Sequence, residues 1–468
     1  MRKIRIEPLL KEFNAVFEKN GFEAYLVGGA VRDLMLKKTA SDHDVATNAT
    51  PEQVMNMFKF VIPTGIAHGT VTVHFKYKGH TEEIEVTTFR TESDYSDGRH
   101  PDKVSYAATI QEDLSRRDFT MNAIAVNLKD GKIIDPFHGR RDIRKKVIRT
   151  VGKPGERFME DGLRPIRALR FASQLKFCIE KDTFSEIKKP EIQKKITSIS
   201  IERFRDEFLK MLKSEKPSVG LKLMEETGIL KLFIPEFEIC RGCIQGDERG
   251  FHEFDVADHN LYACDGAPKD NLIVRLAAFF HDIGKPESRS TEIISGNEVV
   301  HFHGHEKISE KKTIRAMTNL KFSNDEIKKV SHLVKEHMFH YESSWTNAAV
   351  RRFIIRIGTE NLHDLILLRL ADTHGMHNTP VIEGSPSWNN IVELKKRIEE
   401  ILSENSALSL KDLKVNGNDL MQEGIPRGKE LGMILRELFE TVTDSPNMNE
   451  RETLLSLAKN IHETKFKN

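Results

Sequence analysis

The chain has 468 residues, and its 38% hydrophobic and 31% charged residues are typical of a soluble globular protein of three or four domains. No apolar run approaches the roughly 20 residues that a membrane helix needs, because Arg275 interrupts the most apolar stretch, LIVRLAAFF. The start, MRKIRIEPLL, lacks the apolar segment of a signal peptide. We therefore expect a cytoplasmic protein without a membrane partner.

Four cysteines in a chain of this length do not predict a disulfide framework. Cys240 and Cys243 form one CxxC without a second pair, which favours ordinary thiols over a zinc or redox site. The net charge is only +1, but residues 140–176 hold twelve Lys/Arg and four Asp/Glu, a net charge of +8. Such clustering is typical of a solvated helix face or of a surface that follows a phosphate backbone.

The first 150 residues carry mixed strand and helix signals. AYLVGGA predicts a buried strand that ends at Gly28-Gly29. GTVTVHFKYKG and TEEIEVTTFR alternate apolar and polar residues, as half-buried strands do. AIAVNL and KIIDPF predict a hairpin around Asp130-Gly131. We expect a head with a small mixed β-sheet.

From about residue 156 the apolar spacing of three and four predicts helices. A histidine-rich helical region follows over about 250–375, GSPSW at 384–388 resembles a linker, and a charged helical tail ends the chain. The predicted class is α+β, with an all-helical body after the head. The predicted domains are the head 1–150, a helical neck 151–235, the histidine-rich domain 236–383 and the tail 384–468.

Two aspartates follow the first strand closely. Asp42 and Asp44 lie two apart, so on a strand both side chains point the same way. Their mutual repulsion is relieved by a cation, and Mg²⁺ suits such a site because it takes oxygen ligands and keeps positions open for phosphate. Glu85, on an expected neighbouring strand, is a candidate third carboxylate.

The glycine turn before these aspartates favours an anion site. Backbone N–H groups at Gly28 and Gly29 can approach a phosphate closely, and Arg32 can reach the same phosphates. No GxxxxGK[ST] occurs, which excludes a P-loop. A lone DxD is more often a solvated turn, but GGxxR upstream favours a nucleotide site.

Further along, Asp161, Arg164, Arg167 and Arg170 repeat at intervals of three. Because each residue of a helix advances by about 100°, this spacing carries Arg170 roughly to the side opposite Asp161. Pro165 predicts a helix start near 161–164 or a kink.

A second group of candidate ligands lies in helical contexts downstream. Histidine and aspartate side chains that converge from several helices can hold one or two divalent metal ions. Three further histidines of this region, His252, His303 and His374, are not assigned to the group. The candidate ligands are His259, His281, Asp282, His305, His337 and Asp372.

Four motifs of the first half occur in an order that resembles a known family. GGAVRD…DHD, TESDYSDGRHPDKV, RRDFTMNAIA and RTVGKPGERFMEDGLRPIRALRF look like those of the class II tRNA nucleotidyltransferases, which are CCA-adding enzymes, and of the bacterial poly(A) polymerases. The resemblance covers at least residues 22–235. It implies nucleotidyl transfer with Mg²⁺ on Asp42 and Asp44, using ATP and CTP on the 3′ end of tRNA.

The resemblance also implies roles for individual residues. Gly29 and Arg32 would hold the triphosphate, and Arg117 matches an arginine that contacts the nucleotide. Asp118 and Asn122 either tie this segment down or are ordinary structural polar residues. The loop SDYSDGRHPDKV, 93–104, argues against an enzyme that adds only CC.

Four residues would contact the nucleotide in the family pattern: Asp161, Arg164, Arg167 and Arg170. Cytosine and adenine both present an amino donor beside a ring-nitrogen acceptor, which Asp161 and Arg164 match. Guanine and uracil present an acceptor where cytosine and adenine present a donor, and a donor where they present an acceptor. Such a pair therefore favours cytosine and adenine over the wrong base by about 1–3 kcal/mol. Asp-x-x-Arg is otherwise most often a surface ion pair.

The histidine pattern resembles the HD phosphohydrolase superfamily. It implies a divalent transition metal or Mg²⁺ and phosphoester hydrolysis, for which a 2′,3′-cyclic phosphate at a damaged RNA end is one candidate substrate. The tail resembles the C-terminal helices of CCA-adding enzymes, where Lys411, Lys414, Arg427 and Lys429 are candidate contacts to the tRNA body.

Three other functions remain open at this point. The first is a poly(A) polymerase or an enzyme that adds only the terminal A. The second is a nucleotide-responsive RNA-binding protein with a degenerate head, and the third makes the histidine-rich half the principal enzyme. The intact DxD argues against the second.

Overall fold

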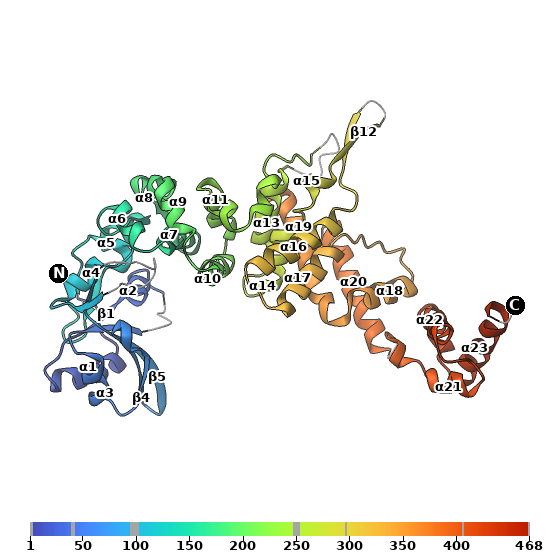
Figure 1. The fold of residues 1–468 in the computed structure, drawn as a ribbon, viewed down its shortest axis with the longest axis horizontal. Helices are drawn as coiled ribbons and strands as arrows, with labels where there is room; N and C mark the ends of the chain where they lie inside the picture. Colours follow the sequence, from blue (N-terminus) through green and yellow to red (C-terminus); the bar gives the residue numbers. More distant parts are fainter. Residues whose placement is uncertain are drawn as a thin grey trace. The chain divides into compact units, whose positions relative to one another are not determined.

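The computed structural model of the chain describes residues 3–38, 43–93, 103–246, 253–294, 297–404 and 407–466 (Figure 1). The chain divides into two compact units, Met1–Glu238 with Asn319–Lys321, and Ile239–Thr318 with Phe322–Asn468. Of the helices described, none combines the length and the hydropathy needed to cross a bilayer.

A mixed sheet forms the centre of the head. Within the described residues it has seven strands in the order β3-β4-β5-β2-β1-β8-β9, of which β2 and β5 are parallel neighbours. The sheet confirms the predicted strands and the hairpin at Asp130-Gly131. The strands are β1 (Ala24–Val27), β2 (His43–Thr47), β3 (Val61–Gly65), β4 (Thr70–Tyr77), β5 (His80–Thr88), β8 (Ala125–Asn127) and β9 (Ile133–Ile134).

Aromatic side chains pack α1 (Pro8–Lys19) onto the sheet. The Phe13 ring stacks on Phe58 with centroids 4.9 Å apart and meets the edge of Phe75, from β4, at 5.2 Å. Phe13 and Phe17 are fully buried. The shorter head elements are α2 (Gly28–Met35), α3 (Pro51–Met57), β6 (Arg90–Ser93), β7 (Lys103–Tyr106), α4 (Ile110–Ser115) and α5 (Gly139–Lys145).

The rest of the first unit is helical, apart from a two-stranded parallel pair of β10 (Val147–Ile148) and β11 (Cys178–Ile179). The predicted helix start near 161–164 is confirmed, because α6 (Pro154–Glu160) ends before Asp161 and α7 (Leu163–Leu175) begins two residues later. Pro165 lies in the first turn, where its missing N–H costs no hydrogen bond. The other helices are α8 (Lys181–Ile187), α9 (Pro190–Ile196), α10 (Ile201–Leu212), α11 (Pro217–Glu226) and α12 (Ile229–Phe233).

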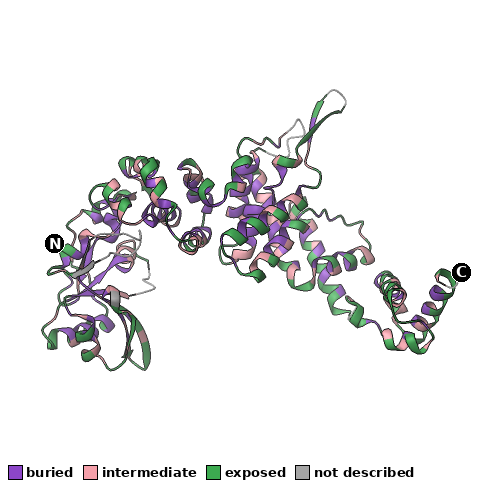
Figure 2. Ribbon diagram, viewed as in Figure 1, coloured by how far each residue is buried: buried purple, intermediate pink, exposed green. Residues whose placement is uncertain are grey.

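The second unit is a helical bundle with one hairpin. Helices α13, α14 and α19 contact one another, and their facing sides are buried (Figure 2). The hairpin of β12 (Ser290–Ile294) and β13 (Asn297–His301) projects from these helices in Figure 1. The helices are α13 (Val256–Gly266), α14 (Leu272–Phe280), α15 (Lys285–Ser288), α16 (His305–Asn319), α17 (Asn324–Glu336), α18 (Asn347–Ile357) and α19 (Leu362–His377).

The segment GSPSW is not a linker. Ser385 caps α20 (Pro386–Ser403), because its side chain accepts a hydrogen bond from the Trp388 N–H at 3.3 Å, and Pro386 occupies the first helical position. The tail has its own apolar core, which includes Leu420, Leu438 and Leu454. Its helices are α21 (Gly417–Gln422), α22 (Lys429–Asp444) and α23 (Arg451–Lys465).

The α+β class with a mixed-sheet head and a helical body is therefore confirmed. The body departs from an all-helical one only in the short pairs β10–β11 and β12–β13, within the part of the chain that is described. The strands β10 and β11 have two residues each, and β12 and β13 have five each.

Candidate functional site

Two carboxylates of the head face each other across adjacent strands. Asp44 on β2 is the direct partner of Glu85 on β5, as the parallel register pairs them. In the described part of the chain, this juxtaposition bears out the expected neighbouring strand. Asp42, the other predicted carboxylate, and residues 94–102 of the predicted loop lie outside the described residues.

The glycine turn lies directly against Asp44. Gly28 follows β1, opens α2 and has a φ of +70°. A Cβ atom at Gly28 would lie 3.3 Å from Asp44 Oδ2 and 3.2 Å from Arg117 Nη1, and one at Gly29 would lie 3.5 Å from Arg32 Nη2. Glycine is therefore needed at position 28 both for the backbone conformation and for this close approach.

A hydrogen-bond chain connects Arg32 to Arg167 of α7. Arg32 Nη1 donates to Asn122 Oδ1 at 3.1 Å, and Asn122 Nδ2 donates to Asp118 Oδ1 at 3.1 Å. Arg167 Nε donates to Asp118 Oδ2 at 2.9 Å. Burial acts to raise the pKa of Asp118, but the Arg167 charge and the hydrogen bonds outweigh it and lower that pKa to about 2. Asp118 and Asn122 thus hold these arginines in place.

Asp113, which the sequence prediction missed, orients the RRD segment. Its buried carboxylate accepts from Arg116 Nη2 at 2.8 Å and from Arg117 Nη2 at 3.3 Å. The Arg116 carbonyl in turn accepts from Arg164 Nη2 at 3.0 Å. The spacing of three and four residues between Asp113 and the two arginines was the signal available in the sequence.

The predicted geometry of the Asp161 repeat is wrong for Arg170. Asp161 lies between α6 and α7 with φ −141° and ψ 115°, so the rotation of 100° per residue does not apply to it. Asp161, Arg164, Arg167 and Arg170 all line one cavity. The Arg170 guanidinium stacks over Phe171 at 3.9 Å and pairs with Glu207.

Helix α10 supplies two partners that the sequence prediction also missed. Arg203 Nη2 donates to Asp161 Oδ2 at 2.8 Å, so the predicted candidate Asp161 pairs with Arg203. Glu207 is 2% exposed and carries the Arg170 ion pair. The signal was Arg203 and Glu207 at a spacing of four on one helix, which is also a common surface pattern.

The cavity around these residues has a volume of about 1060 Å³. Nine Lys/Arg and four Asp/Glu line it, so its surface attracts anions. The predicted residues Gly28, Gly29, Arg32, Arg117 and Glu85 are among its lining. A triphosphate fits the charge, and the volume lies at the upper end of ligand sites.

The second unit brings together all six of its predicted ligands. Asp282 Oδ2 lies 3.3 Å from both His259 Nε2 and His281 Nε2, whereas Asp282 Oδ1 lies 3.1 Å from His305 Nε2 and 3.5 Å from His337 Nε2. Asp372 Oδ1 lies 3.2 Å from His259 Nε2. Asp282 thus stands between two groups of donors, each compact enough for one cation.

The opposite edges of three imidazoles are held by the main chain. The Nδ1 atoms of His281, His305 and His337 lie 2.8, 2.6 and 2.6 Å from the carbonyl oxygens of the residues three positions earlier. A carbonyl only accepts, so each Nδ1 carries a proton and each Nε2 faces the cluster. This orientation is the one that metal-binding histidines use.

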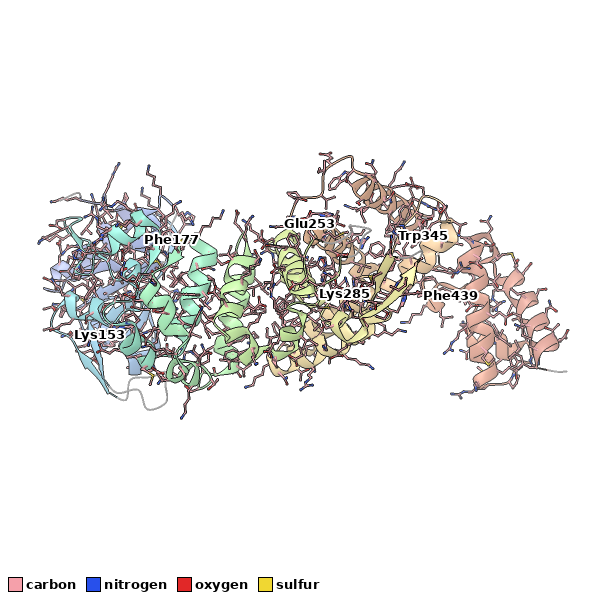
Figure 3. The ribbon with its side chains drawn as sticks, turned by 90° about the horizontal axis from the view of Figure 1, so that it is seen from above. Lys153, Phe177, Glu253, Lys285, Trp345 and Phe439 are labelled. Carbon is pink, nitrogen blue, oxygen red and sulfur yellow. The ribbon has the colours of Figure 1, made fainter. Side chains whose placement is uncertain are left out.

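Lys285, labelled in Figure 3, adds a positive charge at the cluster. Its Nζ lies 2.6 Å from Asp282 Oδ2 and donates to Gln245 Oε1 at 2.6 Å. Burial acts to raise the pKa of Asp282, but His281 and Lys285 hold it well below the usual value. Burial likewise acts to raise the pKa of Asp372, but hydrogen bonds from His259 and His281 and the Arg369 charge hold it well below the usual value, so both acids of the cluster are ionised at neutral pH.

The remaining candidates have plainer surroundings. His303 lines a cavity beside Asp282 and His305, the His374 side chain packs against Gly266, and His252 lies outside the described residues. Burial raises the pKa of the Cys240 and Cys243 thiols, which fits ordinary thiols. In the tail, the four basic candidates Lys411, Lys414, Arg427 and Lys429 are exposed.

Three protein-family models match the chain. Residues 24–149 match the poly A polymerase head domain, and residues 176–240 match a model described as a probable RNA and SrmB-binding site of polymerase A. Residues 300–458 match tRNA nucleotidyltransferase domain 2. The first two matches fall on the head and on the neck helices, and the third falls on the second unit.

Relatives and solved structures agree with these models. The CCA-adding enzyme of Lactobacillus johnsonii is 48% identical over 222 residues, which are 47% of this chain and 53% of that relative. The Bacillus stearothermophilus CCA-adding enzyme in complex with CTP covers 99% of this chain and 100% of its own, with a TM-score of 0.72 at 28% identity. The CCA-adding enzyme of Enterococcus faecalis is 33% identical over 457 residues, 97% of this chain and 94% of that relative. Because this last match spans nearly the whole of both proteins, the chain belongs to the family of CCA-adding tRNA nucleotidyltransferases.

Proposed function

We propose that this chain builds and repairs the 3′-terminal CCA of tRNA without a nucleic-acid template, using CTP and ATP and releasing pyrophosphate. The observation that carries the proposal is the register of Asp44 against Glu85 beside the Gly28 turn, at a cavity rich in arginine. The name of the Enterococcus faecalis relative and the solved CTP complex support this choice of reaction. We also propose a cytoplasmic location.

The chain's own side chains would hold Mg²⁺ and the triphosphate. Asp44 and Glu85, with Asp42, offer the carboxylate oxygens that Mg²⁺ prefers, and the bare Gly28 backbone leaves space beside Asp44. Mg²⁺ held by these residues would lower the pKa of the RNA 3′-hydroxyl and would neutralise the departing pyrophosphate. Arg32 orients the phosphates from the side of Asn122.

Base selection is proposed for the start of α7. Asp161 would accept from the amino group of cytosine or adenine, and Arg164 would donate to the ring nitrogen beside it. Arg203 Nη2 and the Leu163 N–H donate to the Asp161 carboxylate at 2.8 and 2.9 Å, which orients it. Arg117, Arg167 and Arg170 are proposed to contact the bound nucleotide from the same cavity.

The nearest rival is a poly(A) polymerase or an enzyme that adds only the terminal A. The distinguishing experiment supplies CTP and ATP separately and together to a tRNA transcript that ends at the discriminator nucleotide. Sequencing of the product ends should show two C and one A. Addition of A alone, without CMP incorporation, would overturn the proposal.

We propose a second activity, metal-dependent phosphoester hydrolysis of the HD type, for the second unit. The support is the set of metal-binding side chains. Four Nε2 atoms and two buried carboxylates converge, and main-chain carbonyls hold three of the imidazoles with Nε2 facing the cluster. These residues fit a transition metal or Mg²⁺, which would supply an activated water. Asp282 would serve both cation positions.

The test measures bound metal and hydrolysis of a nucleoside 2′,3′-cyclic phosphate for the wild type, His281→Ala and Asp282→Ala. We expect both variants to lose metal and hydrolysis while CCA addition stays at the wild-type rate. A wild type that binds no divalent metal at this cluster and hydrolyses nothing would refute the second activity and leave the first untouched.

A further inference from the structure

The cavity of the second unit opens on one side of the His/Asp cluster. It has a volume of about 380 Å³ and is lined by Asp282, His305, His337 and Asp372. His259 and His281 are not among its described lining residues, so they lie behind the other ligands. A ligand that enters this cavity therefore meets the Asp282–His305–His337 group first.

One cation in the wall retains donors for an anion. Arg369 Nη1 donates to Asp372 Oδ2 at 2.8 Å, and Arg369 also lines the cavity. A guanidinium has five N–H donors, so this single ion pair leaves capacity for phosphate oxygens. Lys285 is engaged by Asp282 and Gln245, which makes Arg369 the better phosphate anchor.

A stacked pair of rings lies on another part of the same wall. His301 ends β13, and its ring stacks on that of His303 with centroids 5.1 Å apart and an interplanar angle of 14°. Both rings line the cavity, and His303 is exposed. Near-parallel flat side chains beside an open space are the surface on which nucleobases stack, at about 1–3 kcal/mol for each base.

The cavity has two features that a simple phosphate site does not need. Besides the metal-type ligands and Arg369, it has the stacked rings and two polarisable side chains, Met338 and Met376. Its volume falls within the range of small-molecule sites of about 300–1,000 Å³. Inorganic phosphate would use only the charged part of this wall.

We propose that this cavity selects a nucleotide, with the base stacked on His301 and His303 and the phosphate held by Arg369 in front of Asp282. The proposal rests on the proposed hydrolase activity and assigns the residues that recognise its substrate, a base-bearing phosphate such as the terminal nucleotide of an RNA strand. His301 and His303 are then specificity-determining residues, and Arg369 orients the phosphate.

The test uses the full chain labelled with [¹³C]histidine, in the presence of Mg²⁺, with 3′-CMP and inorganic phosphate as separate probes. Single variants assign the His301, His303 and His337 resonances. We expect 3′-CMP to shift both His301 and His303, whereas inorganic phosphate shifts His337 but leaves the stacked pair almost unchanged. Because the reporters are local, binding of CMP in the head does not imitate this result.

Variants then separate the two contacts. The double variant His301→Gln, His303→Gln should bind 3′-CMP about tenfold more weakly and should bind inorganic phosphate as the wild type does. The shift of the His337 resonance measures both affinities. Arg369→Gln should lower the affinity for both probes by about tenfold or more, with the bound-metal content measured as the control. Exposed His340→Ala is the matched control for both.

The outcomes distinguish this inference from the proposed hydrolase. Shifts of His301 and His303 by 3′-CMP in a chain that hydrolyses no phosphoester would support nucleotide binding and overturn the hydrolase. Hydrolysis that is equally fast for glycerol 2-phosphate and a cyclic nucleotide, without those shifts, would overturn the inference and leave the hydrolase standing.

Discussion

The two sites of this chain surround their acids in opposite ways. In the head, Asp44 and Glu85 are partly or fully exposed at a cavity of about 1060 Å³ with a large excess of arginine. In the second unit, Asp282 and Asp372 are buried among four histidines beside a cavity of about 380 Å³. The first arrangement suits a cation that arrives with a triphosphate, and the second suits a cation that the protein itself encloses.

The same contrast extends to how the residues are oriented. Main-chain carbonyls hold the imidazoles of the second site, so its donors are set before any ligand binds. In the head, acidic side chains hold the arginine side chains, as Asp118 holds Arg167 and Asp113 holds Arg117. A site that must accept both CTP and ATP gains from arginines that are oriented yet have donors to spare.

The largest expected effect is the loss of nucleotide addition when the head site alone is changed. Asp44→Ala should reduce CMP and AMP incorporation by on the order of 10³-fold, since a metal contributes several kcal/mol to the transition state. Metal content of the second unit should stay at the wild-type value. The control is Glu83→Ala, an exposed acid on the same strand as Glu85. Wild-type incorporation of CMP and AMP by Asp44→Ala would show that Asp44 has no catalytic role.

The converse change should weaken metal binding in the second unit and leave the head active. His281→Ala should weaken divalent metal binding at the cluster by at least about 100-fold, because it removes a direct donor where even supporting groups are worth 10- to 100-fold. Calorimetric titration and metal analysis measure this, with nucleotide addition unchanged. His340→Ala, at a 73% exposed side chain, should bind metal normally. Equal metal binding by both variants would contradict the assignment.

A smaller effect tests how the head holds its arginines. The pKa of Asp118 is lowered to about 2, so its ionised form stabilises the fold by about 2 kcal/mol above pH 4, and this contribution is lost as the pH falls towards 2. Asp118→Asn should therefore lower the unfolding temperature at pH 7 and lower it progressively less below pH 4. Calorimetric scans at several pH values measure the difference. A gap that is constant with pH would show that the carboxylate charge contributes nothing.

The smallest expected effect concerns the partner of Asp161. Arg203→Ala should reduce discrimination of CTP and ATP against UTP and GTP by about tenfold, because Asp161 loses one of its two donors. Competition between nucleotides in single-turnover assays measures the ratio. Lys213→Ala, just beyond the same helix and exposed, is the control. Unchanged discrimination would mean that Leu163 N–H alone orients the carboxylate.

The sequence predicted much of the head because its signals are local. Alternating strands, the Gly28 turn and the approximate helix break before Pro165 each depend on neighbouring residues, and all are found. The linker prediction failed at Ser385, since Ser-Pro is a turn signal and also a helix start, and only the chain that follows decides between them.

Contacts between distant segments were beyond the sequence pattern. Arg203 lies 42 residues from Asp161, and Glu207 lies 37 residues from Arg170. Neither pairing follows from periodicity, because it depends on how α10 packs against α7. The histidine ligands were found nevertheless, because the order of the His and Asp motifs along the chain resembles that of the HD superfamily, and the structure brings all six together.

The most direct test of the central claim is anomalous diffraction from crystals grown with Mn²⁺ and a non-hydrolysable CTP analogue. We expect an anomalous peak between Asp44 and Glu85 that contacts the triphosphate, together with peaks at the histidine cluster as an internal reference. Peaks at the histidines alone, with the triphosphate bound away from Asp44, would contradict it.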